Sequence, residues 1–146
     1  TDLTLPIGKR LELTGEFYRG QAVAGLGGGI GQDVLLDGPF VSPTTTIRGL
    51  DSTGGWAQLK IKVKSNFEIN GAFGLDNPFA DEVREYTTFG LYSGTFTRNQ
   101  TTLVNFIYQI RSNILFSTEY RYLNTTLLDS GSNSASHINL SMGYLF

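Results

Sequence analysis

Residues suited to nucleophilic hydrolysis stand at every second position near the end of the chain: His137, Asn139 and Ser141. Alternate positions of a strand share one face. A serine and its histidine must lie within hydrogen-bond reach, whereas residues four apart on a strand are separated by roughly 13 Å. We therefore expect no catalytic dyad from these residues and interpret them as a polar lining. The only histidine of the chain also argues against a histidine-based metal site.

Two other segments could bind ions or phosphates. The run Gly25 to Gly31 lacks the G-x-G-x-x-G spacing, and we expect no helix after it, so a flexible loop is the better interpretation. Asp76, Asp81, Glu82 and Glu85 could hold Ca²⁺, but they lack EF-hand spacing and read as a solvated acidic loop. We predict no catalytic residue, no metal and no cofactor.

Composition narrows the class of protein. The 146 residues include 40% hydrophobic and 16% charged side chains and no cysteine, which suits a single unit over 1–146. With 11 basic and 13 acidic residues, the chain lacks the excess of positive charge that nucleic-acid-binding proteins usually have. No apolar run approaches the roughly 18 residues of a transmembrane helix.

The elements that must position these residues have the period of strands. Apolar residues recur at every second position in six segments: 10–20, 55–64, 67–75, 102–111, 114–123 and 136–146. A length of about ten residues is that of a tilted membrane-crossing strand. Leu3, Leu5 and Ile7 alternate in the same way and predict the end of a further strand over 1–7.

The alternation separates two kinds of side chain. One parity is uncharged and includes Leu11, Leu13, Leu59, Ile61, Ile69, Phe73, Val104, Phe106, Phe116 and the tyrosines Tyr108, Tyr120, Tyr122 and Tyr144. The other parity holds Glu12, Glu16, Lys60, Lys62, Lys64, Glu68, Asn105, Gln109, Arg111, Glu119, Arg121, His137 and Asn139. A soluble sandwich also alternates and stays open as an alternative. The tyrosines, with Tyr18, favour a membrane, where they would form interfacial girdles.

The connections differ in length. Lys64-Ser65-Asn66-Phe67 and Arg111-Ser112-Asn113-Ile114 repeat one short turn, in which we expect asparagine to adopt the left-handed conformation and Lys64 to lie opposite Glu68. Long polar connections are predicted over 21–54, 76–101 and 124–135. Within the first of them, 33–37 and 44–48 could pair as a short hairpin that folds over the mouth or protrudes.

The last eleven residues resemble the terminal strand by which the barrel-assembly machinery recognises outer-membrane proteins. That pattern has a terminal phenylalanine and apolar residues at each second position before it, which Phe146, Tyr144, Met142, Leu140 and Ile138 match. The rest of the chain resembles the final strands of a porin-like barrel. The resemblance implies an all-β, antiparallel up-and-down transmembrane β-barrel in the bacterial outer membrane.

The resemblance also sets expectations for topology and function. Short turns would face the periplasm and long loops the outside. Seven spans do not close a single-chain bacterial barrel, so the chain reads as truncated at its amino end and as part of a larger barrel. The charged parity would line the lumen of a passive channel. A non-conducting barrel with a structural or surface-interaction role is the alternative. A barrel enzyme such as a lipase is disfavoured, because the sequence shows no recognisable set of catalytic residues. Partners would be outer-membrane lipid, lipopolysaccharide, the assembly machinery and possible further copies.

Overall fold

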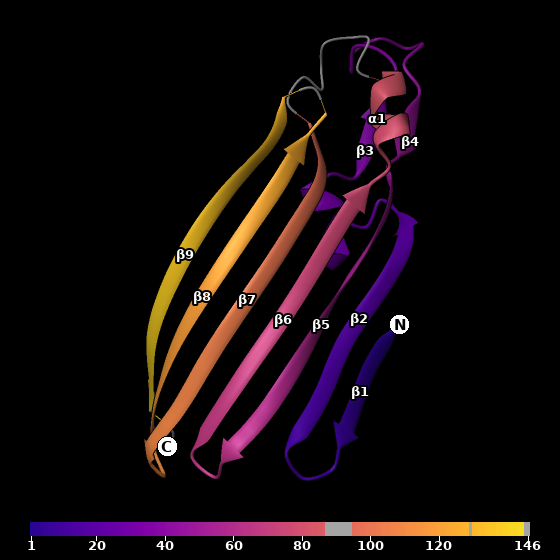
Figure 1. Ribbon diagram of the computed structural model, residues 1–146. Helices are drawn as coiled ribbons and strands as arrows, with labels where there is room; N and C mark the ends of the chain where they lie inside the picture. The colour runs from indigo at the N-terminus through magenta and orange to yellow at the C-terminus, as the bar shows by residue number, and fades with distance from the viewer. Residues whose placement is uncertain (87–94, 129, 145–146) are drawn as a thin grey trace.

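A long antiparallel sheet dominates the structure, which is a computed structural model that describes residues 1–86, 95–128 and 130–144. Its strand order is β1-β2-β5-β6-β7-β8-β9, so each strand lies beside its sequence neighbour within this sheet (Figure 1). The strands are β1 (Asp2–Ile7), β2 (Leu11–Gln21), β5 (Asp51–Lys64), β6 (Phe67–Pro78), β7 (Phe96–Arg111), β8 (Ile114–Leu127) and β9 (Gly131–Tyr144). The predicted all-β antiparallel fold and its strands are confirmed.

The strands extend further than the apolar alternation predicted. β8 and β9 pair from Ile114↔Tyr144 up to Leu127↔Gly131, so the predicted long connection over 124–135 is wrong. Its residues are strand, because the hydroxyl groups of Thr126 and Ser132 meet across the ladder at 3.0 Å and both backbones pair. A search for alternating apolar residues does not detect strand ends that consist of polar residues.

Both short turns share one irregularity. Lys64 pairs with Phe67, but the next pair is Lys62↔Glu68, which leaves Val63 unpaired in a bulge; Arg111↔Ile114 and Gln109↔Leu115 leave out Ile110 in the same way. The predicted pairing of Lys64 with Glu68 is therefore wrong. Without a bulge, a two-residue turn would pair the charged Glu68 with the apolar Val63. The bulge instead pairs Glu68 with Lys62, so that polar residues share one face of the sheet.

The predicted left-handed asparagines are also wrong. Among the described non-glycine residues, only Ala22 and Ile30 have a positive φ. Two-residue hairpins favour left-handed turns because these match the twist of the strands. Here the bulge before each turn adds that twist, so Asn66 and Asn113 keep an ordinary backbone conformation.

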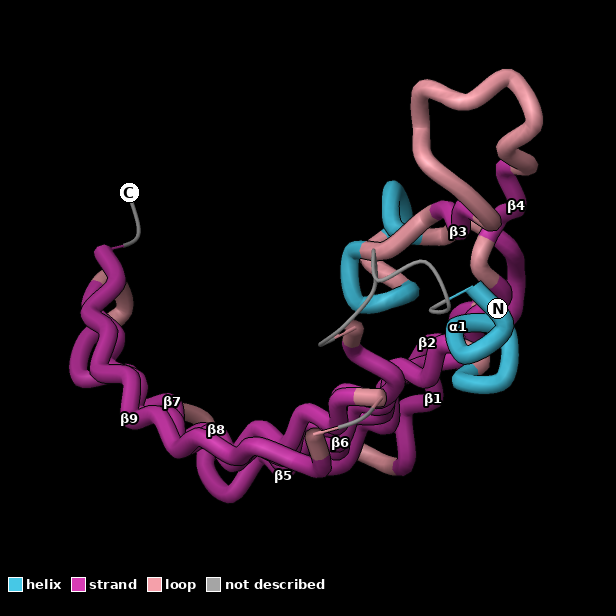
Figure 2. The backbone as a smooth tube through the Cα atoms, turned by 90° about the horizontal axis from the view of Figure 1, so that it is seen from above, coloured by secondary structure: helices cyan, strands magenta, loops and turns pink. Residues whose placement is uncertain are grey.

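The sheet is strongly curved and open. Figure 2 shows it from above as a crescent, with the short helical turns lying on its concave side. β1 and β9 each pair on one side only within the described residues, so two edges remain free. Six antiparallel steps separate these strands, so β1 and β9 run in the same direction.

A small cap stands at the end of the sheet opposite the short turns. It contains the 3-10 turns η1 (Ala24–Leu26) and η2 (Gly29–Gly31), the strands β3 (Val34–Leu36) and β4 (Ile47–Gly49), and the helix α1 (Ala80–Tyr86). β3 and β4 pair as the hairpin that the sequence predicted. Leu35, Leu50 and Val83 form the buried cluster, with Tyr86 and Leu128 packed against it. The hydrophobic core thus lies in the cap, and the sheet has an uncovered apolar side.

Truncating this core should loosen the cap. Leu50 is fully buried, and Leu50→Ala should lower the free energy of opening the cap by about 2–5 kcal/mol, because it removes transfer energy and leaves a cavity. Hydrogen exchange at the amides of β3 and β4 measures this change. Val41→Ala, at a side chain that is 91% exposed, is the control and should change it by less than about 0.5 kcal/mol.

No helix among the described residues is both long enough and apolar enough to cross a bilayer.

Candidate functional site

The register of the main sheet fixes two faces. One row of neighbours is Leu13, Leu59, Gly71, Val104, Tyr120 and Ile138, and the adjacent row is Glu12, Lys60, Asn70, Asn105, Glu119 and Asn139. We call the face of the first row the apolar face and that of the second row the polar face. Asp76 lies on the polar face and is bonded to η2, so this face is the concave one (Figure 2).

The polar row is held together by hydrogen bonds and ion pairs across the strands. Lys60 Nζ donates to Glu12 Oε1 at 2.7 Å, and Asn70 Nδ2 donates to Asn105 Oδ1 at 3.2 Å. On β8 and β9, Glu119 Oε1 lies 2.9 Å from Arg121 Nη2 and accepts a hydrogen bond from Asn139 Nδ2 at 3.0 Å. Opposite charges therefore neutralise each other along much of this face.

The other predicted lining residues lie in neighbouring rows of the same face or at the turns. Arg121 lies opposite His137, and Lys62 lies opposite Glu68. Lys64, Gln109 and Arg111 stand at the end of the sheet with the short turns, beside the two bulges. The set is thus spread along the strands and is not gathered at one point of the sheet.

An aromatic side chain on the polar face was missed by the sequence analysis. Trp56, the only tryptophan of the chain, lies opposite Glu16, and its Nε1 donates to Glu16 Oε2 at 3.2 Å. Its parity matches that of Gln58 and Lys60, which would have placed it among the polar residues. The residue as a whole is 44% exposed.

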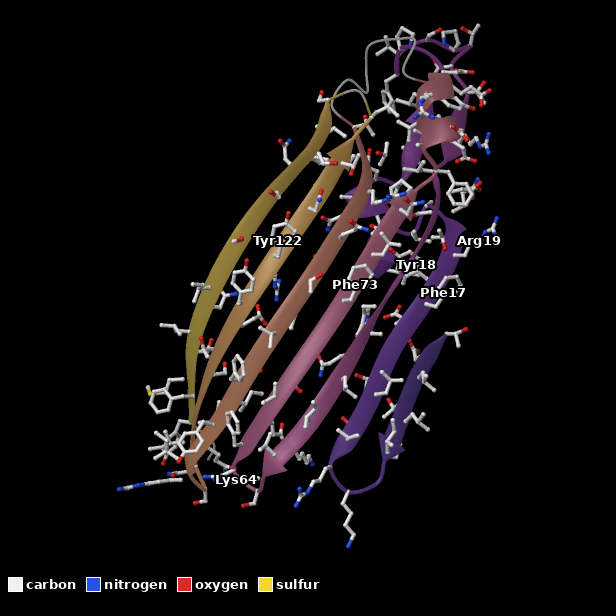
Figure 3. All side chains as sticks on the ribbon, in the orientation of Figure 1. Phe17, Tyr18, Arg19, Lys64, Phe73 and Tyr122 are labelled. Carbon is white, nitrogen blue, oxygen red and sulfur yellow. The ribbon has the colours of Figure 1, made fainter. Side chains whose placement is uncertain are left out.

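Tyr18 does not belong to an interfacial girdle, which corrects the expectation from sequence. It shares the parity of Glu16, and its ring lies over Gly54, where a Cβ would come within 2.3 Å of the tyrosine oxygen. The ring also covers Gly28, so it lies between the sheet and the glycine-rich segment. Figure 3 labels Tyr18 next to Phe17, its neighbour on the opposite face of β2.

The glycine-rich segment is bound to the sheet through one carboxylate. Asp76 Oδ1 accepts hydrogen bonds from the Gly29 amide at 3.1 Å and from Ser52 Oγ at 2.9 Å, and Asp76 Oδ2 accepts one from the Ile30 amide. The predicted free loop is therefore an anchored turn. Consecutive backbone amides form a concave anion site of this kind, and here the protein's own carboxylate fills it.

The other residues whose types could support hydrolysis or metal binding do not form a common site in the described structure. Asn139 binds Glu119, while His137 and Ser141 lie opposite Arg121 and Ser117, so these three residues make no mutual hydrogen bond in the described chain. The acidic residues of the second connection are also separated, since Asp76 is on β6 and Glu82 is on α1. No group that could hold a metal occurs among the described residues.

Carboxylates in the cap have structural partners. Glu82 binds the Arg48 guanidinium and accepts a hydrogen bond from the Asp51 amide at 3.0 Å, and the negative charge of Glu82 raises the pKa of Arg48. Hydrogen bonds from Thr46, first from its backbone amide, lower the pKa of Asp37. Glu82 therefore links α1 to β4 and to the start of β5, whereas Asp37 closes the connection between β3 and β4.

The apolar face is uncovered in the described structure. Phe17 is 60% exposed on β2, and Ile138, Leu140, Met142 and Tyr144 are between 63% and 79% exposed on β9. These four residues of the predicted assembly signal lie on the apolar face, and Phe146 lies outside the described residues. Near the cap, Asp51 and Arg98 depart from the charge partition, as does Arg19, whose parity is that of Phe17. The Arg19 guanidinium lies 5.6 Å from the centre of the Phe79 ring, beside the cap and beyond the apolar band.

Comparison of the chain with protein-family models, curated proteins and solved structures finds no match.

Proposed function

We propose that this chain forms part of an outer-membrane β-barrel that acts as a porin-like channel for small solutes or ions. One observation carries the proposal, namely an antiparallel sheet with an uncovered apolar face, free of charged side chains from Leu11 to Phe17 on β2, and a concave face that holds ion pairs. Monomeric soluble proteins rarely expose large contiguous apolar patches, whereas hydrocarbon would satisfy this face. The stretch from Phe67 to Leu75 on β6 also has about the 9–11 residues that a tilted span needs.

The direction of the edge strands supports a larger barrel. Because β1 and β9 run in the same direction, an all-antiparallel closure requires an odd number of further strands between them. An unpaired edge exposes backbone hydrogen-bonding groups, which hydrocarbon cannot satisfy, so both edges need partners in a bilayer. Further strands of the same barrel meet this need.

The polar face favours passage of small polar solutes without strong charge selection at its centre. Lys60 with Glu12 and Arg121 with Glu119 are neutral pairs, so neither sign dominates the middle of the lining. The cap and its anchored glycine turn lie at one mouth, where they would set the width of the entrance.

A non-conducting barrel is the second candidate, and the same ion pairs favour it. In a narrow barrel, paired side chains and the inward glycine turn would fill the lumen, and the cap would serve contacts at the cell surface. In either case the proposed partners are outer-membrane lipid, lipopolysaccharide and the barrel-assembly machinery, which would recognise β9 through its exposed apolar residues. Further copies of the chain could associate through the apolar face.

Conductance of the whole folded protein in a planar bilayer tests the channel. We expect discrete open-channel steps, and Asn105→Trp should reduce the step size because it adds bulk to the polar face. Val104→Trp, one residue away on the apolar face, is the matched control and should leave the step size unchanged. Protein that floats with lipid vesicles in a density gradient but leaves a planar bilayer sealed would favour the non-conducting barrel.

A further inference from the structure

Every lysine of the chain lies in the half of the sheet nearer the short turns. Lys9 is in the β1–β2 turn, and Lys60, Lys62 and Lys64 stand at every second position towards the end of β5. Arg10 precedes β2, and its carbonyl accepts a hydrogen bond from the Lys62 amide at 2.7 Å. The turn and the strand end are thus held side by side. Figure 3 shows Lys64 at this end, far from the cap.

Most of these cations have no carboxylate partner. Lys60 binds Glu12, but Lys9, Arg10, Lys62 and Lys64 take part in no ion pair with the described residues. Their side chains are exposed, so a ligand from solution can reach them. The chain as a whole has a net charge of -2, so this concentration of positive charge is a local feature.

The cations line two adjoining recesses. The larger, of about 360 Å³, is lined by Lys9, Arg10, Lys62, Val63, Lys64, Ser65 and Glu68. The smaller, of about 150 Å³, shares Lys9, Arg10 and Lys62 with it. A volume of several hundred Å³ is that of a small-molecule site. Lys62 and Lys64 flank the bulge at Val63, and both line the larger recess.

We propose that the larger recess binds a multivalent phosphate oxyanion, and we call this recess the rim site. Lysine ammonium groups and a guanidinium are the usual protein ligands of phosphate oxygens. Glu68 lies in the recess and opposes binding, but four cations outweigh its single charge. The rim site is independent of channel activity, since a non-conducting barrel would have the same recess.

Calorimetric titration of the folded protein with pyrophosphate tests the site directly. We expect saturable binding that weakens with added salt, because the contacts are between charges. Replacing Lys9, Lys62 and Lys64 together by glutamine should weaken binding at least about tenfold. Glu68→Gln should strengthen it, because a repelling charge is removed. No saturable binding, or binding that Glu68→Gln weakens, would overturn the proposal.

A matched triple variant separates a site from a general charge effect. Arg19, Arg84 and Arg98, replaced together by glutamine, remove the same charge from the far end of the molecule, and pyrophosphate affinity should stay unchanged. An equal loss in both triple variants would overturn the rim site. Acetylation of the unmodified protein avoids any folding defect: pyrophosphate should protect Lys9, Lys62 and Lys64 from the reagent, and unprotected lysines would contradict the assignment.

The phosphate could come from solution or from a lipid headgroup, and two bilayers distinguish these sources. The titration is repeated in nanodiscs of phosphatidylcholine and in nanodiscs that also contain phosphatidic acid, whose phosphomonoester is multivalent. Equal affinity in both supports a free phosphate ligand. Weaker pyrophosphate binding with phosphatidic acid, at the same ionic strength and with phosphatidylglycerol as the anionic phosphodiester control, supports a headgroup as the occupant. Absence of binding in both bilayers would contradict the proposal.

Discussion

Leu59→Arg should lower the free energy of unfolding from a lipid bilayer by about 2–4 kcal/mol, the cost of placing arginine against the hydrocarbon midplane. Leu59 lies in the middle of the apolar face, between Leu13 and Gly71, and is 38% exposed. Urea unfolding of the protein in lipid vesicles, followed by Trp56 emission, measures this loss.

Gln58→Arg is the matched control for this prediction. Gln58 is the preceding residue of β5, so the same arginine would point to the concave side, between Thr14 and Ala72. We expect a loss of less than about 1 kcal/mol, because water or other polar groups can solvate the guanidinium there. Equal losses at the two positions would mean that the faces do not differ in environment.

Asp76→Ala should release the glycine-rich segment from the sheet. Hydrogen bonds to a charged group each contribute about 1.5–3 kcal/mol, and the Gly29 and Ile30 amides would both lose their acceptor. Hydrogen exchange at these two amides should therefore accelerate at least about tenfold. In the proposed channel, the same variant should widen the entrance and increase the open-channel current.

Asp33→Ala is the control for the release of the segment. Asp33 Oδ1 accepts a hydrogen bond from the Ala24 amide at 2.7 Å, within the same loop but away from the sheet. Exchange should accelerate at Ala24 and stay slow at Gly29 and Ile30. If Asp76→Ala leaves exchange at Gly29 and Ile30 unchanged, the carboxylate does not anchor this turn.

The sheet could be predicted from sequence because its signal is local. Alternation with period two places Leu59 and Lys60 on opposite faces without any knowledge of their neighbours. Strand ends such as those around Thr126 were missed, because serine, threonine and asparagine there form ladders without apolar residues. The bulge at Val63 was detectable in principle, since a two-residue turn and matched faces are incompatible without an extra residue.

The contacts of the site were less predictable because they join distant residues. Asp76 was predicted to lie in a loop because Asn and Pro follow it, yet it lies within β6 and binds amides more than forty residues earlier in the chain. Trp56 has the parity of the charged residues, and this parity alone was sufficient to predict its place on the polar face, but the prediction was not made. The rim site depends on Lys9 meeting Lys62, which only the pairing of β2 with β5 creates.

Single spin labels along β5 test the central claim, that the apolar face contacts hydrocarbon and the polar face does not. The chain contains no cysteine, so one cysteine can be introduced and labelled at each of positions 57 to 61. In lipid vesicles, we expect labels at 57, 59 and 61 to be accessible to oxygen dissolved in the bilayer, and labels at 58 and 60 to be accessible to a water-soluble nickel complex. Accessibility to the nickel complex at all five positions would contradict the account.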